Sequence, residues 1–127
     1  MRILVADDHE VVRRGIRGVL ESHEGYVVCG EARNGLEAVT QTRKLKPDVL
    51  ILDITMPELS GFEAARIILK EQPALPIVIL SVHKSSPAVK MARDIGVKAY
   101  VLKSTAADEL VDAIEAIRNG RTHFPRS

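Results

Sequence analysis

The sequence predicts an α/β protein in which five parallel strands form a doubly wound sheet covered by helices on both faces. Short apolar runs alternate with amphipathic segments five times along the chain. Uninterrupted aliphatic runs, such as residues 49–52, are typical of strands buried on both faces of a parallel sheet. The connections are short, and right-handed crossovers favour the strand order 2-1-3-4-5.

The strands are predicted from the apolar runs, which cover residues 3–6, 26–29, 48–53, 77–80 and 99–102. The segment after the first strand has helical periodicity, with an apolar stripe and a basic stripe. The apolar stripe contains Val12, Ile16, Val19 and Leu20. The basic stripe contains Arg13, Arg14 and Arg17, and we expect it to face solvent.

The other four helices are placed by their capping residues. Each start has a polar side chain or a proline suited to the first turn, and the ends are marked by proline or glycine. The second helix starts at Asn34, with Glu37 three residues on, and stops before Pro47. The third has Ser60 and Glu63 and ends at Pro73, and the fourth runs from Ser86-Pro87 to Gly96. The last is expected from Thr105, capped with Asp108, to Asn119-Gly120.

Composition limits the classes of partner. The 127 residues correspond to one domain, and 46% of them are hydrophobic, which supports a packed core. The formal net charge is +1, so nucleic acid or an anionic membrane is not expected as the main partner. The single cysteine, Cys29, is expected to be a small buried side chain. With no signal peptide or long apolar run, we expect a cytoplasmic protein.

Polar residues stand where four of the five predicted strands end. They are Asp7 and Asp8 after the first strand, Asp53 at the end of the third, Ser81 after the fourth and Lys103 after the fifth. Because the carboxyl ends of parallel strands share one edge of a sheet, these side chains are expected to meet in one cleft.

Three neighbouring carboxylates repel one another by about 1–4 kcal/mol per pair, so a proton or a cation must sit among them. Hard oxygen ligands favour Mg²⁺. Lys103 and the Ser81 hydroxyl supply donors for a second anion. A metal, a carboxylate nucleophile at Asp53 and these donors form an arrangement suited to phosphoryl transfer.

Each of these residues also has an ordinary structural explanation when taken alone. Asp7 and Asp8 are suited to cap the first helix, and Asp53 is suited to a turn. Lys103 resembles many surface lysines. The coincidence of four strand ends with one chemistry favours function over these explanations.

Together these motifs resemble the receiver domain of two-component response regulators, over nearly the whole chain. The resemblance rests on Asp7-Asp8, the segment 53–57 (Asp-Ile-Thr-Met-Pro) with Gly61, Ser81, Lys103-Ser104 and Tyr100. It implies a flavodoxin-like (βα)5 fold and supports the strand order given above, since the order 2-1-3-4-5 is known from this superfamily.

The resemblance also implies roles. Asp53 would accept a phosphoryl group from a sensor histidine kinase. The Mg²⁺ ligands would be Asp8, Asp53 and the Thr55 carbonyl, with Asp7 acting through water. Lys103 and Ser81 would hold the phosphoryl oxygens, and Ser81 with Tyr100 would form the conformational switch. Such a domain is a signalling module that assists only its own phosphorylation and slow dephosphorylation, not an enzyme.

Positions Thr55 and His83 flank the route of an attacking water, and in the family such positions tune the lifetime of the phosphate. For His83 we expect an exposed loop histidine.

Three further motifs are similar to the NarL/FixJ-type subfamily: Asp-Asp-His-Glu, Lys-Pro-Asp-Val and Ile-Arg-Asn-Gly. Those proteins bind DNA through a helix-turn-helix domain that follows the receiver, and they can form homodimers on phosphorylation. We therefore expect residues 1–120 to be the receiver and 121–127 to begin a linker. A fragment of a longer regulator and a stand-alone receiver both remain open.

Three alternatives use the same residues differently. A haloacid-dehalogenase-type phosphatase needs a second acid where this chain has Thr55, and it needs a cap domain. A flavodoxin-like flavin binder needs a hydroxyl-rich phosphate loop where Asp7 and Asp8 stand. A degenerate receiver that only docks partners is disfavoured because every reactive position is filled.

Overall fold

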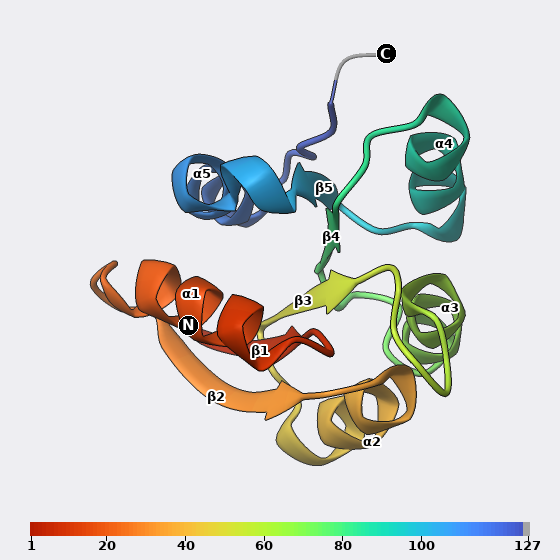
Figure 1. Cartoon of the computed structure of the whole chain (residues 1–127), viewed down its shortest axis with the longest axis horizontal. Coiled ribbons are helices and arrows are strands. Elements are labelled where there is room, and N and C mark those ends of the chain that lie inside the picture. Colours follow the sequence, from red (N-terminus) through yellow and green to blue (C-terminus); the bar gives the residue numbers. More distant parts are fainter. Residues whose placement is uncertain (126–127) are drawn as a thin grey trace.

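Five parallel strands form a single sheet in the predicted order, β2-β1-β3-β4-β5 (Figure 1). The computed structural model describes residues 1–125. The strands are β1 (Arg2–Ala6), β2 (Val27–Ala32), β3 (Val49–Asp53), β4 (Ile77–Ser81) and β5 (Ala99–Leu102). The registers pair Ala6 with Leu52 and Asp53 with Leu80, so the carboxyl ends of β1, β3 and β4 lie at one edge.

Helices cover both faces of the sheet. They are α1 (Glu10–Glu21), α2 (Gly35–Leu45), α3 (Gly61–Glu71), α4 (Ser86–Ile95) and α5 (Ala106–Arg118). Figure 1 shows α1 and α5 on one face and α2, α3 and α4 on the other. Alternate residues of β1 enter two separate apolar clusters: Leu4 and Ala6 pack beneath α2 and α3, whereas Ile3 and Val5 pack beneath α1 and α5.

The capping signals place four helix starts correctly. The Asn34 side chain accepts from the Glu37 backbone N–H, and Ser60 and Glu63 form the complete capping box. The start of α4 has Pro87 in its first turn, as predicted. Thr105 is the N-cap of α5, as predicted, but it ends a 3₁₀ turn over Lys103–Thr105 and makes no side-chain capping bond. Its hydroxyl donates back to the Leu102 carbonyl instead.

The basic stripe of α1 is not uniformly solvated, which corrects the prediction for Arg13. Arg14 is exposed and Arg17 is half-buried, but Arg13 is only 8% exposed. Its Nη1 donates to the Asp7 carbonyl at 2.6 Å, and its Nε donates to Glu31 at 2.9 Å. A charged group is buried here because a carbonyl and a carboxylate replace its water.

Strand β2 is longer than the apolar run that predicted it. The pairing with β1 shifts register after Ile3 and continues to Ala32, so β2 includes the polar Glu31. Cys29 is half-buried rather than buried, and it packs against the apolar cluster under α2 and α3.

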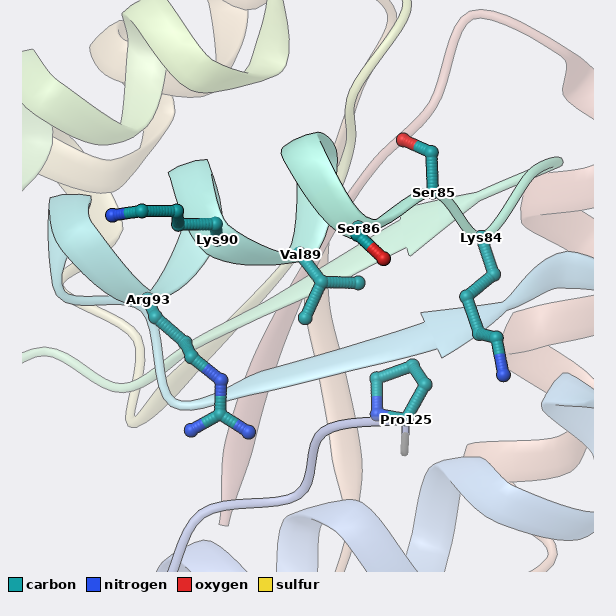
Figure 2. Close-up of a pocket in the computed structure, with 7 residues that line it drawn as sticks. All are labelled: Lys84, Ser85, Ser86, Val89, Lys90, Arg93 and Pro125. Carbon is teal, nitrogen blue, oxygen red and sulfur yellow. The ribbon is translucent and has the colours of Figure 1, made fainter. Parts of the chain in front are cut away.

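The segment after α5 lies along the outer edge of β5. The His123 N–H donates to the Lys98 carbonyl at 3.0 Å, and the Tyr100 N–H donates to the His123 carbonyl at 2.8 Å. Arg93 of α4 stands over the Phe124 ring, 4.2 Å from its centre. Figure 2 shows Pro125 facing the hollow beside Val89 and Arg93, so residues 123–125 join β5 to α4.

Among the helices of residues 1–125, none is both long and apolar enough to cross a membrane.

Candidate functional site

The strand ends bring together the acids and the lysine that the sequence places there. Lys103 Nζ lies 2.8 Å from Asp7 Oδ2 and 3.2 Å from Asp53 Oδ2. Asp7 is 0% exposed and Asp53 is 2% exposed. Asp8 lies beside them, and we call Asp7, Asp8, Asp53 and Lys103 the acid cluster. The cluster holds three carboxylates against one ammonium, so negative charge is in excess.

The excess negative charge affects the pKa of Asp53. Burial, together with the neighbouring Asp7 charge, raises the pKa of Asp53 to about 6, because Lys103 offsets only part of these two effects. For Lys103, burial would lower the pKa, but the attraction of Asp7 and Asp53 outweighs it and holds the pKa above its usual value. The Lys103 ammonium therefore stays charged at neutral pH, whereas the charge of Asp53 depends on pH close to neutrality.

The acid cluster fits a divalent ion. One ligand atom from each of Asp7, Asp8, His9 and Asp53 lies within 4.8 Å of all the others. The buried Asp7 Oδ2 and Asp53 Oδ2 share the single Lys103 ammonium, and the buried Asp8 Oδ1 lies 3.1 Å from His9 Nδ1. One ammonium cannot balance three neighbouring carboxylates, and a divalent cation between them would offset the remaining negative charge. The donor set is mostly hard oxygen, which suits Mg²⁺.

The end of β4 carries a second group of polar contacts, which we call the hydroxyl cluster: Ser81, His83 and Tyr100. The Ser81 hydroxyl donates to the His83 carbonyl at 2.7 Å and accepts from the His83 N–H at 3.1 Å. The Tyr100 hydroxyl, from a side chain 1% exposed, donates to the same carbonyl at 2.7 Å. The imidazole of His83 is exposed, as predicted.

The two clusters face one open pocket. Its lining residues are Asp8, His9, Asp53, Thr55, Ser81, Val82, His83 and Lys103. Thr55 is exposed there, and its backbone N–H approaches Asp53 Oδ1 at 3.4 Å. Tyr100 is not in this pocket but in a neighbouring hollow that it shares with His123 and Phe124. The structure thus separates Tyr100 from the reactive acids, while Tyr100 and Ser81 share the His83 carbonyl as an acceptor.

A glycine after β3 fixes the approach of α3 to the site. A Cβ on Gly61 would lie 2.1 Å from the Asp53 carbonyl oxygen and 2.7 Å from Ile54 Cα. The Gly61 N–H donates to the Ile54 carbonyl at 2.7 Å. Any side chain at this position would therefore push the Asp53 loop away from the helix.

Two residues of the site were not identified from the sequence. Arg13 holds the Asp7 carbonyl from α1, and the spacing of Arg13, Ile16 and Leu20 on one helix face could have revealed it. His9 lies with Nδ1 3.1 Å from Asp8 Oδ1 and 3.3 Å from Asp7 Oδ1. Its position directly after the acid pair was the available signal.

The chain is similar to known proteins over nearly its whole length. Residues 3–115 match the family model described as the response regulator receiver domain. The chain is 36% identical over 124 residues to the response regulator protein VraR of Staphylococcus epidermidis, which covers 98% of this chain and 59% of VraR. The chain spans about three-fifths of the length of such curated relatives.

Solved structures agree. A two-component response regulator of the LuxR family from Aurantimonas sp. superposes with a TM-score of 0.92 and 40% identity, over 96% of this chain and 87% of that one. The isolated receiver domain of RcsB from Salmonella enterica serovar Typhimurium, solved with phosphomimetic BeF₃⁻, gives a TM-score of 0.91 and 30% identity. That match covers 99% of this chain and 94% of the other.

Proposed function

The chain belongs to the response regulator receiver domain family, in its LuxR/NarL-type branch, and from that premise we propose that Asp53 accepts a phosphoryl group from a sensor histidine kinase. The observation that carries the proposal is the convergence of the buried Asp7 and Asp53 carboxylates on one ammonium, Lys103 Nζ, at 2.8 and 3.2 Å.

The transfer is a displacement at phosphorus. A carboxylate oxygen of Asp53 attacks the phosphorus of a phosphohistidine on the kinase. The O–P bond forms as the N–P bond breaks, and the bonding electrons return to the imidazole nitrogen, which then takes a proton. Positioning and charge stabilisation supply most of the catalysis in such reactions.

The acid and hydroxyl clusters then divide the work. Asp8, Asp53 and the Thr55 carbonyl would hold Mg²⁺, with Asp7 acting through water. When bound, Mg²⁺ neutralises the charge that develops on the transferred oxygens. Lys103, already 3.2 Å from Asp53, pairs with one phosphoryl oxygen. Ser81 can donate to another, but its hydroxyl must first leave the His83 carbonyl.

That exchange is the proposed switch. Once Ser81 turns towards the phosphoryl group, the His83 carbonyl keeps only the Tyr100 hydroxyl as a donor from this cluster. The loop after β4 and the ring of Tyr100 then move together, which changes the surface formed by α4, β5 and α5. A few charged hydrogen bonds can supply the roughly 5 kcal/mol that a full population shift requires.

In a longer parent protein this surface would control a helix-turn-helix domain that binds DNA, through a homodimer formed on phosphorylation. The receiver would act stoichiometrically: it assists its own phosphorylation and slow dephosphorylation and turns over no other substrate.

The test is phosphorylation by acetyl phosphate with Mg²⁺, read by intact-protein mass spectrometry. We expect a single phosphoryl adduct on Asp53 in wild type and none in Asp53→Asn. Asp112→Asn, a change of an exposed acid on α5, is the matched control and should be modified like wild type. An adduct that persists in Asp53→Asn would overturn the assignment. Continuous release of phosphate from many small phosphoesters would favour a phosphatase instead.

A further inference from the structure

An imidazole lies beside the acid cluster, on the side away from the lysine. Lys103 contacts Asp7 Oδ2 and Asp53 Oδ2, whereas His9 Nδ1 lies near Asp7 Oδ1 and Asp8 Oδ1. The two cationic side chains thus approach different oxygens of Asp7. A metal ion on the His9 side would not have to displace the ammonium.

The position of His9 makes it available as a ligand. The residue precedes the first turn of α1, and its side chain makes no capping bond to that helix within the described residues. The backbone N–H donates to Asp7 Oδ1 at 2.9 Å, which fixes the main chain beside the acid. The side chain is 66% exposed, so the ring can adjust by small rotations. His9 and the three acids together satisfy the spacing of a four-residue metal group.

The imidazole of His9 gives this four-residue group a different metal preference from a group of carboxylates alone. Carboxylates and water suit Mg²⁺, whereas imidazole nitrogen suits Zn²⁺, Ni²⁺, Co²⁺ and Cu²⁺. These ions also bind any nitrogen and oxygen site more tightly than Mn²⁺, in the Irving–Williams order. Adding one nitrogen to three oxygens therefore raises affinity for borderline ions and leaves affinity for Mg²⁺ nearly unchanged.

We propose that His9 is a metal ligand that makes the phospho-acceptor site bind borderline transition-metal ions, of which Ni²⁺ is the probe used below, in competition with Mg²⁺. The inference rests on the proposed function in one respect, since it uses the same acids that would hold Mg²⁺. It adds a consequence: which metal ion occupies the site depends on which ions are supplied.

His83 provides an internal control. It is also exposed and lines the same pocket, but it follows β4 on the side of the hydroxyl cluster. It is not a member of the metal group formed by Asp7, Asp8, His9 and Asp53. Removing it changes the pocket without removing the nitrogen that faces the acids.

The experiment is calorimetric titration of the untagged chain with NiCl₂ and, separately, with MgCl₂ at neutral pH. The proteins are wild type, His9→Gln and His83→Gln. In His9→Gln we expect Ni²⁺ affinity to fall at least about tenfold, the scale on which even outer partners of a metal act, with Mg²⁺ affinity unchanged. In His83→Gln both affinities should match wild type. With Co²⁺ bound, we expect His83→Gln to have the same visible absorption bands as wild type and His9→Gln to have shifted bands.

The outcomes separate this inference from the proposed function. Equal Ni²⁺ affinity in wild type and His9→Gln would overturn the inference and leave phosphorylation untouched. Ni²⁺ binding that depends on His9 without measurable Mg²⁺ binding would support the inference and remove Mg²⁺ from the proposed function. An equal loss of Mg²⁺ and Ni²⁺ affinity in His9→Gln would also overturn the inference, because His9 would then be shaping the acids rather than selecting the metal.

Discussion

The acid cluster and the hydroxyl cluster lie on either side of one pocket, yet they are built differently. The acid cluster consists of three carboxylates, two of them buried, that share one ammonium, so negative charge is in excess. The hydroxyl cluster consists of neutral groups whose donors are already satisfied by the His83 carbonyl. One side is poised to gain a ligand, whereas the other must give up a bond to bind one.

The two clusters would therefore contribute differently: the acid cluster favours ligand binding, and the hydroxyl cluster carries the conformational response. The excess negative charge of the acid cluster favours binding of a metal ion, which then favours a phosphoryl group on Asp53. The Ser81 hydroxyl keeps its hydrogen bond to the His83 carbonyl until a stronger acceptor, such as a phosphoryl oxygen, is present. Both can be measured by removing one group at a time.

The largest expected effect follows loss of the ammonium. Lys103→Met keeps the side-chain length but leaves Asp7 and Asp53 without their cation. For the metal-free protein, we expect the free energy of unfolding to fall by about 3 kcal/mol. Urea denaturation measures it, and MgCl₂ should restore part of the loss. Lys70→Met, on the exposed face of α3, is the control. Equal stability of the two variants would mean that the buried charges are not in conflict.

The next effect is on the pH dependence. Since the folded pKa of Asp53, about 6, lies above its unfolded value near 3.8, the folded state binds the extra proton between these pH values. Stability from this group therefore falls as pH rises from about 4 to 6, by about 3 kcal/mol in total. Asp53→Asn should flatten this part of the pH profile of metal-free protein. A variant profile parallel to wild type would contradict the assignment.

Arg13→Ala tests how the acid cluster is held. The guanidinium bonds the Asp7 carbonyl and Glu31, so its loss should cost about 1–2 kcal/mol and loosen Asp7. Arg14→Ala removes an exposed arginine from the same helix and should cost under about 0.5 kcal/mol. Thermal unfolding of both variants gives the comparison. If the two shifts were equal, the burial of Arg13 would have no energetic consequence.

The smallest effect is expected in the hydroxyl cluster. Tyr100→Phe removes one donor to the His83 carbonyl while Ser81 still donates there, so the cost should be about 1 kcal/mol or less. A double-mutant cycle with Ser81→Ala measures their coupling, which should be positive because they share an acceptor. Strict additivity would show that the two hydroxyls act independently.

Much of this arrangement could be predicted from the sequence, because strand ends and helix starts are local signals. Asp53 follows an apolar run, and Asn34 and Ser60 precede helical periodicity. The burial of Arg13 could not be predicted as readily, because it depends on Glu31, in a part of β2 that the apolar run did not reveal. The Thr105 side chain makes no capping bond to α5, because a 3₁₀ turn that begins at Lys103 directs its hydroxyl towards the Leu102 carbonyl.

The stretch that follows α5 has a consequence for handling the protein. By pairing with Lys98 and Tyr100, His123 occupies backbone groups that would otherwise lie open along the outermost strand. Open strand edges recruit other chains and seed aggregation. A version of the chain shortened at Gly120 should therefore be prone to self-association and precipitation even though all five strands and helices are retained.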